Sequence, residues 1–275
     1  MTNFIPNPSN FLNTENTNKI ILFYFFKFSK FSNSSEFLIS ISNNKINCLH
    51  WFNCQYTNIG KEDFWTNAAI IEFENKEILE KAFNNKLEFN TIKALQVFMV
   101  LPKNPSRLLL NFLKLFRPVG YLFKLFKNSS IEELIENNNS EILPSKKQTE
   151  RLLNETSNKK AYMINLLEAR ETAKYSDLSI VISGKEAYYK KYGNIASRSV
   201  LLMGGDITYV GRFNGEPLIE FNVPNDTKGN WQALGIMEYP LARNMLDLEK
   251  MPGYKEALKH RDAGLKKTFN LYSTK

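Results

Sequence analysis

The pattern of apolar and polar positions divides the chain into two apolar blocks separated by polar stretches. Residues 1–18 hold six asparagines and two prolines, which predicts a loose N-terminal arm. A second polar region, at 128–159, predicts a linker whose ends hold short helices. Two blocks remain, 19–127 and 160–275, and each is long enough for a domain of its own.

The second block has the periodicity of alternating strands and helices. A run of strand length, AYMINLLEA, precedes a segment with helical spacing that begins at Ser183, a residue suited to capping a helix. Gly204 and Gly205 are expected to end that helix, since glycine readily adopts the left-handed conformation found there. The predicted order is strand, helix, strand, strand, helix, strand, at 161–169, 183–203, 206–213, 231–239, 241–264 and 267–273.

The first block repeats this order less clearly. Residues 64–73 align without gaps to residues 230–239 at a constant offset of 166, which places Trp65 on Trp231. The shared order and this match together predict an internal duplication. The expected elements of the first block lie at 20–28, 34–42, 46–56, 64–74, 76–85 and 92–101.

The element order of each block is that of the ferredoxin-like split βαβ unit. The helices of such a unit cover one face of its sheet, so the other face needs a partner. Two units in one chain can provide it by packing sheet to sheet. The sequence therefore predicts an α+β fold of two ferredoxin-like units in tandem, the first spanning 19–127 and the second 160–275.

Charge is concentrated in one short segment. Residues 103–127 contain six basic residues and no acidic one, and so account for six of the eight net positive charges. Because a nucleic-acid-binding protein usually has a broad basic face, this distribution argues against nucleic acid as a partner.

The same segment has the pattern of a basic amphipathic helix rich in Phe and Leu. Two alternatives follow: the helix lies in an anionic membrane surface, or it packs its Phe/Leu side on the protein while its lysines face water. At 100° per residue, one arc of about 160° holds five basic residues. These candidates for membrane binding are Arg107, Lys114, Arg117, Lys124 and Lys127.

Metal and nucleotide chemistry have little support in the sequence. Cys48 and Cys54 match no common zinc spacing and are expected to be free thiols. The chain has two histidines and no glycine-rich phosphate loop, so neither a metal nor a cofactor is expected. The N-terminus lacks the features of a signal peptide, and no apolar run is long enough to span a membrane. The expected location is cytoplasmic, with peripheral membrane association as the alternative.

Five separated motifs in the second block carry a resemblance to a known family. This block resembles the "domain of unknown function 1330" proteins of the dimeric α/β-barrel superfamily. The motifs are NLLxxR at 165–170, GKEAYxxY at 184–192, GG at 204–205, EYP at 238–240 and HRxAGL at 260–265.

The resemblance implies a dimeric α/β barrel built within one chain, with a pocket between sheet and helices. The wider superfamily includes cofactor-independent monooxygenases, dehydratases and haem-binding enzymes, so the resemblance alone implies no reaction. The first block lacks the GKEAY and HRxAGL residues and looks like a degenerate partner. One pocket per chain is therefore expected, lined by the second block.

Two charged residues in the last motif are candidates for catalysis. His260 has a side chain suited to proton transfer at neutral pH, and Arg261 or Arg170 could hold an anionic oxygen. In the alternative, His260 and Arg261 are the basic end of a helix, where each favours the helix dipole by roughly 0.3–1 kcal/mol.

Asn165 and two tyrosines are candidates for substrate binding. Asn165 is a polar side chain in an apolar strand, so it is either a structural anchor or a hydrogen-bond donor to a ligand. Tyr188 and Tyr192 share one helix face, where they either pack in the core or line a pocket.

Two functions are therefore carried forward. The first is a small-molecule pocket protein, with a metal-independent enzyme of oxygenase or isomerase type as its catalytic form. The second is a non-catalytic protein that binds a ligand or, through 103–127, an anionic membrane. The partner is a small molecule, and the sequence leaves a homodimer open.

Overall fold

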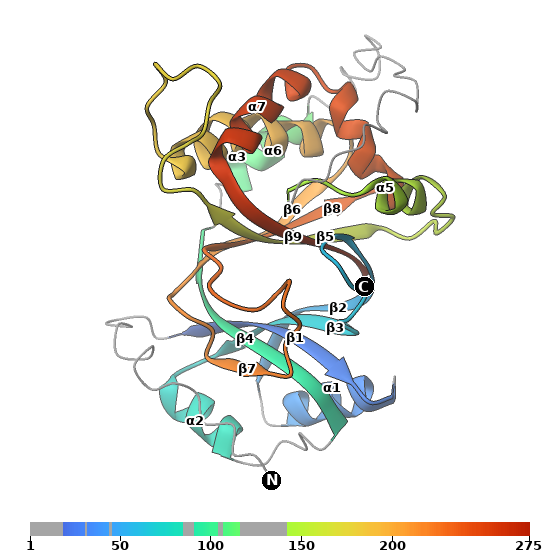
Figure 1. Ribbon diagram of the computed structural model, residues 1–275. Coiled ribbons are helices and arrows are strands. Elements are labelled where there is room, and N and C mark those ends of the chain that lie inside the picture. The colour runs from blue at the N-terminus through green and yellow to red at the C-terminus, as the bar shows by residue number, and fades with distance from the viewer. Residues whose placement is uncertain (1–18, 31, 44–45, 85–90, 104–106, 116–141) are drawn as a thin grey trace.

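The computed structural model describes residues 19–30, 32–43, 46–84, 91–103, 107–115 and 142–275. The predicted arm at 1–18 lies outside these residues, as do Arg117, Lys124 and Lys127 of the basic segment. Figure 1 shows two layers of sheet facing each other, with the helices on the two outer sides.

The N-terminal unit forms a four-stranded antiparallel sheet in the order β4-β1-β3-β2. Its two helices cover the outer face of this sheet (Figure 1). The elements are β1 (Ile20–Phe28), α1 (Ser32–Asn43), β2 (Asn47–Ile59), β3 (Asn67–Phe73), α2 (Lys76–Asn84) and β4 (Ile92–Pro102).

The C-terminal unit repeats the arrangement with a sheet in the order β9-β5-β8-β6. Its first helical segment begins with π-helical turns and continues as an α-helix, and its second is broken after a 3-10 turn. The elements are β5 (Ala161–Ala169), η4 (Glu186–Tyr192), α6 (Gly193–Leu202), β6 (Asp206–Phe213), β8 (Ala233–Tyr239), η5 (Ala242–Lys250), α7 (Tyr254–Gly264) and β9 (Leu265–Thr274).

Edge strands of the two units pair with each other and close the sheet into a barrel. β2 pairs with β9, where Tyr56 lies opposite Tyr272, and β4 pairs with β6, where Val100 lies opposite Phe213. The second strand of each unit thus pairs with the fourth strand of the other. The prediction of two ferredoxin-like units in tandem is confirmed, and no second copy of the chain is needed to close the ring of eight strands.

The barrel interior is rich in aromatic side chains from both units. Phe25 stacks on Trp65 with ring centroids 5.2 Å apart, and meets Phe269 of the other unit edge to face at 6.0 Å. Trp231 is buried in the same core. Its strand β8 and the strand β3 that follows Trp65 differ in both bounds by the predicted 166 residues. The aligned tryptophans therefore occupy equivalent inward positions.

Two further elements lie outside the strands and helices expected for the two units, and the second is where a short helix at the end of the linker was expected. The short strand β7 (Ile219–Phe221) pairs with β4, in the stretch between the expected strands at 206–213 and 231–239. The helix α5 (Lys146–Leu153) lies near the end of the polar stretch at 128–159 and begins with a capping box between Ser145 and Gln148. Gln148 also donates a hydrogen bond of 2.8 Å to the carbonyl oxygen of Gly60.

The described part of the basic segment is the helix α3 (Arg107–Leu115). Two of its apolar side chains, Leu108 and Leu115, face away from the protein and are 83% and 73% exposed. Leu110 is buried instead, and the Lys114 ammonium lies 2.5 Å from the Asp206 carboxylate. Lys114 is thus engaged within the protein rather than directed to water.

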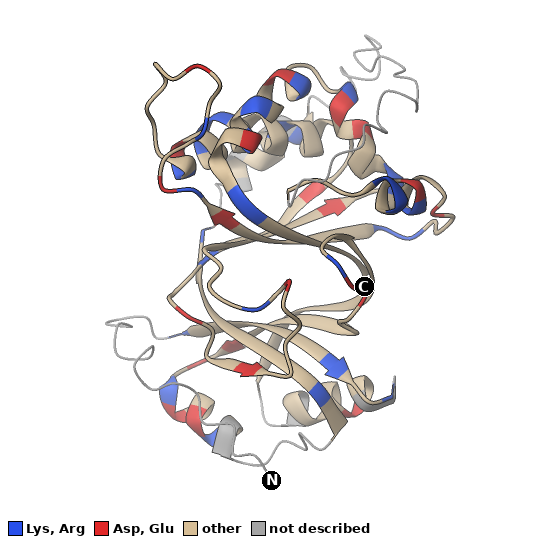
Figure 2. Ribbon diagram, in the orientation of Figure 1, with Lys and Arg blue, Asp and Glu red and all other residues tan. Residues whose placement is uncertain are grey.

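Charged residues gather on the helices and loops, while the barrel strands are largely uncharged (Figure 2). Among the residues that the structure describes, no helix is long and apolar enough to cross a membrane.

Candidate functional site

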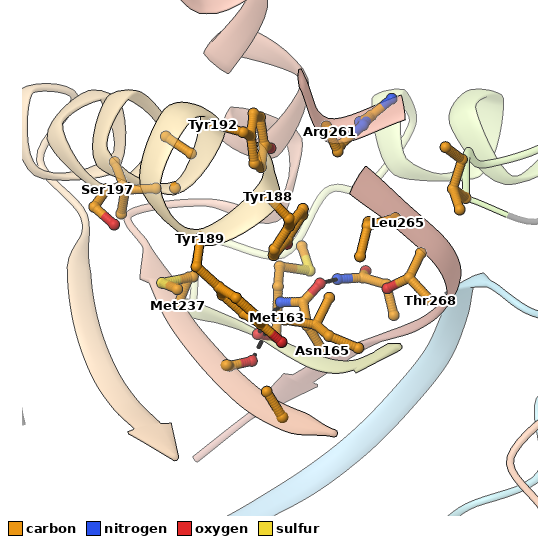
Figure 3. Close-up of a pocket in the computed structure, with 18 of the residues that line it drawn as sticks. Met163, Asn165, Tyr188, Tyr189, Tyr192, Ser197, Met237, Arg261, Leu265 and Thr268 are labelled. Carbon is orange, nitrogen blue, oxygen red and sulfur yellow. Dashed lines mark hydrogen bonds between the residues drawn. The ribbon is translucent and has the colours of Figure 1, made fainter. Parts of the chain in front are cut away.

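A cavity of about 690 Å³ lies in the C-terminal unit between the sheet and the helices that cover it. This volume falls within the range of small-molecule sites. Met163 and Asn165 on β5 and Met237 on β8 line it from the sheet, and Tyr188 and Tyr189 project toward them from the helical layer (Figure 3). The alternation of β5 explains the division, because Ile164 and Leu166 point the other way into the barrel.

Asn165 belongs to a ladder of three asparagines that crosses the junction between the two units. Asn270 on β9 donates to its side-chain oxygen at 2.6 Å, and Asn58 on β2 donates to Asn270 at 2.9 Å. The Asn165 amide itself donates to the carbonyl oxygens of Met163 and Gly235 at 3.1 and 3.2 Å. Because its oxygen and its amide group already have protein partners, Asn165 lines the cavity as a structural anchor.

Tyr188, Tyr189 and Tyr192 all line the cavity from the π-helical segment η4. The i-to-i+5 bond from Gly193 to the carbonyl of Tyr188 marks this winding, which is rare and often found at functional sites. The rings of Tyr188 and Tyr192 lie 5.2 Å apart, as their predicted shared face requires. The Tyr192 hydroxyl lies 2.7 Å from that of Tyr254 on α7.

Burial raises the pKa of two of these phenols further above neutral pH. It raises the pKa of Tyr189 to about 12 and that of Tyr188 well above its ordinary value. The Tyr189 hydroxyl is buried without a hydrogen-bond partner in the described residues. The cavity therefore presents neutral hydroxyl groups, which can donate to an acceptor on a ligand.

Arg261 reaches the same cavity from α7, beside Tyr192 (Figure 3). Its side chain is 15% exposed, and its Nε donates to the neighbouring Asp262 at 3.1 Å. Among the described residues its two terminal nitrogens have no hydrogen-bond partner. They are available to an acceptor on a ligand.

His260 and Arg170 are not among the residues that line this cavity. The Nδ1 atom of His260 lies 2.7 Å from the hydroxyl of Tyr175, and burial, aided by the charges of Lys191 and Lys259, lowers the His260 pKa. The Nε of Arg170 is buried without a hydrogen-bond partner in the described residues. Of the six predicted catalytic and substrate-binding residues, the structure therefore brings together Asn165, Tyr188, Tyr192 and Arg261.

Glu249 on η5 is a cavity residue that the sequence did not single out. Burial raises the pKa of its carboxyl group, while the positive charges of Lys255 and Arg261 oppose that rise. In the sequence it is one of several charges in a polar helical segment, and nothing there distinguishes it from a solvated one.

Two glycines of the family-like motifs hold the cavity helices together. A Cβ atom on Gly184 would lie 2.7 Å from the carbonyl oxygen of Gly264, and a Cβ on Gly264 would lie 2.7 Å from that of Gly184. Only residues without a Cβ allow this approach between the start of η4 and the end of α7. The contact fixes the helices that carry Tyr188 and Arg261 relative to each other.

Within the described ranges, no group of three or more His, Cys, Asp or Glu side chains is placed to hold a metal ion. Cys48 and Cys54 are free thiols, both partly buried, and burial raises the pKa of each.

Neither the family models nor the curated proteins include a match to this sequence. Similar solved structures include a protein of unknown function from Rhodopseudomonas palustris, 25% identical over 48% of this chain and 93% of that chain, with a TM-score of 0.40. A variant of chlorite dismutase from Candidatus Nitrospira defluvii is 11% identical over 95% and 92%, with a TM-score of 0.41. An anthrone oxidase-like protein is 6% identical over 94% and 92%, with a TM-score of 0.40.

At these TM-scores the likenesses carry no argument about function. The strand pairing itself defines the class: the chain is an α+β protein of the dimeric α/β-barrel type, with both halves of the barrel in one polypeptide.

Proposed function

We propose that the protein binds a small molecule in the cavity of its C-terminal unit. The observation that carries this proposal is convergence: Asn165, Tyr188, Tyr192 and Arg261 come from three separated motifs and line one cavity of about 690 Å³. Scattered surface positions would be expected if these residues served only solubility. The resemblance of the motifs to the domain of unknown function 1330 proteins, which implies a pocket between sheet and helices, adds support.

Methionine methyl groups offer a direct test of ligand binding. Met163, Met237 and Met245 line the cavity, while Met99 is buried in the N-terminal unit. We expect that some members of a small-molecule library will shift the methyl NMR signals of the three cavity methionines in full-length, methyl-labelled protein. The Met99 signal should stay in place. The proposal would be contradicted if no compound shifted the signals of the three cavity methionines, or if the Met99 signal shifted by as much as theirs.

A catalytic form of the proposal is favoured by one observation, the carboxyl group of Glu249 in the cavity wall. A carboxyl group in a cavity wall can accept and return a proton, and burial raises the pKa of this one above its ordinary value. We therefore assign the acid/base role of a metal-independent, isomerase-type reaction to Glu249 instead of His260. An oxygenase-type reaction in the same cavity would differ by consuming O₂ during turnover.

Exchange of carbon-bound hydrogen for deuterium tests this role of Glu249. For cavity ligands found by NMR that carry an acidic C–H bond, we expect the protein to catalyse exchange with solvent D₂O, followed by mass spectrometry. The Glu249→Gln variant should lower the exchange rate by about 100-fold or more, the usual contribution of a general base. The His260→Ala variant should retain the wild-type rate. An equal loss of exchange rate in the His260→Ala variant would indicate that His260 takes part in the proton transfer.

Peripheral membrane association through 103–127 stays the alternative proposal. The outward position of Leu108 and Leu115 supports it, whereas the pairing of Lys114 with Asp206 removes one of its five basic candidates. Flotation of the full chain with anionic vesicles tests this alternative. Flotation of the wild type that Leu108→Glu abolishes would support membrane association. A wild type that does not float with the vesicles would exclude it.

A further inference from the structure

We propose that the cavity selects an anionic molecule with an apolar body, and that Arg261 holds its anionic group. This inference rests on the proposed function, because it names the class of ligand for the same cavity. Three independent features of the site support it: the state of the Arg261 side chain, the hydroxyl groups around it, and the balance of charge along the cavity wall.

The first feature is a largely buried guanidinium group that the protein itself pairs only in part. The Arg261 side chain is 15% exposed, and its partner Asp262 is its immediate neighbour in the chain, with a half-exposed carboxylate. Burying a cation is costly unless it is paired and hydrogen bonded. A ligand oxygen bearing negative charge would complete the pairing of the terminal nitrogens, and the planar guanidinium fork suits a carboxylate or phosphate.

The second feature is the hydroxyl pair of Tyr192 and Tyr254, whose oxygens lie 2.7 Å apart. One phenol of such a pair donates its proton to the other, and the second proton remains available for a further acceptor. Burial raises the pKa of Tyr254 well above its ordinary value, so the Tyr254 hydroxyl stays neutral and can donate. Because Tyr192, Tyr254 and Arg261 all line the cavity, a ligand acceptor can meet both kinds of donor.

The third feature is charge. Five basic residues line the cavity, against the two acids Glu186 and Glu249. A positive wall of this kind raises the local concentration of anions and speeds their entry. Four of the five basic residues are exposed, and the fifth is Arg261, whose side chain is 15% exposed. The basic residues are Lys103, Lys185, Lys190, Arg212 and Arg261.

The rest of the wall fits an apolar body. Leu167 and Ala233 lie on the sheet side, and Met163, Met237 and Met245 add flexible thioether side chains that adapt to a ligand and contact aromatic rings favourably. A small inorganic anion would leave most of a 690 Å³ apolar cavity unfilled. The ligand class is therefore an amphipathic anion, for which an aromatic or aliphatic carboxylate is the simplest chemistry.

A pair of fluorescent probes with the same apolar body tests this selectivity on the full-length protein. Anilinonaphthalene sulfonate carries a negative charge, and N-phenylnaphthylamine is its neutral counterpart. We expect the wild type to bind the sulfonate more tightly. The Arg261→Met variant should lose roughly 10- to 100-fold in affinity for the sulfonate, the range for hydrogen bonds to a charged group, with little change for the neutral probe.

Two further variants make the result specific. Arg243→Met removes an exposed arginine outside the cavity and should leave the preference unchanged. Arg261→Lys keeps the charge and should retain part of the preference, which also covers the case in which Arg261→Met does not fold. Competition by naphthoate and by naphthyl phosphate then identifies the preferred head group.

The outcomes separate this inference from the proposed function. Equal binding of both probes by the wild type, with shifts of the cavity methionine signals, would overturn the anion selectivity and leave small-molecule binding intact. An unchanged preference in Arg261→Met would overturn the role of Arg261. Failure of both probes and of the library to shift those signals would overturn both proposals.

Discussion

Replacing Phe269 by alanine is expected to destabilise the whole chain by about 3–5 kcal/mol, the usual cost of removing a buried phenylalanine ring. Phe269 is 1% exposed and lies on β9 of the C-terminal unit. Its ring nevertheless packs against the N-terminal unit, edge to face with Phe25 and against the backbone of Gly60, where even a Cβ atom would lie 2.8 Å from the ring. The substitution therefore opens a cavity in a core that both units share.

Because the core is shared, the loss should appear in both units at once. Urea unfolding can be followed by circular dichroism and by the fluorescence of Trp51, Trp65 and Trp231, which report on both units. We expect coincident transitions by the two probes, shifted together to lower urea in the variant. Leu178→Ala, at a position that is 87% exposed, is the matched control and should change stability by less than about 0.5 kcal/mol. Separate transitions, with only one shifted in Phe269→Ala, would show that the units are stabilised independently.

The sequence predicted the elements of both units because hydrophobic periodicity is a local property. The strands at 20–28, 161–169 and 206–213 have the predicted bounds, and the alignment at an offset of 166 places Trp65 and Trp231 at equivalent positions. The pairing that closes the barrel is different in kind. Whether β2 meets β9 depends on the shape of two complete sheets, which no local pattern records.

The site was predicted only in part, because local patterns show which residues share a helix face but not which face meets the cavity. Tyr188 and Tyr192 share a helix face in the sequence, and that face does line the cavity. His260 and Arg261 are neighbours in the sequence, yet a helix turns by 100° per residue, so one reaches the cavity and the other contacts Tyr175. Asn270 carried a detectable signal, a polar side chain in the strand run FNLYS. Glu249 carried no such signal, because its place in the cavity wall depends on how η5 packs against the rest of the unit.

The largest expected effect on binding comes from a residue without a side chain, Gly235. It lies opposite Asn165 in the pairing of β5 and β8, between Leu234 and Ile236, which point into the barrel. By strand alternation, a side chain at this position would enter the cavity. Gly235→Leu should therefore place four carbon atoms on the cavity floor beside Asn165 and abolish measurable binding of ligands, including anilinonaphthalene sulfonate.

Gly235→Ala provides the matched control for this substitution. Its Cβ would lie 3.6 Å from the Met237 methyl group, an ordinary van der Waals contact, so the alanine needs no rearrangement. Since glycine within a strand costs roughly 0.5–1 kcal/mol relative to alanine, Gly235→Ala should be at least as stable as the wild type and should retain binding.

Titration calorimetry with the sulfonate probe, together with thermal unfolding of each variant, distinguishes blocking from misfolding. A Gly235→Leu protein that unfolds cooperatively and does not bind would place the ligand in this cavity. Wild-type affinity in a folded Gly235→Leu protein would place the ligand elsewhere. Loss of binding in Gly235→Ala as well would mean that the floor beside Asn165 is in direct contact with the ligand, because a single methyl group would then be enough to exclude it.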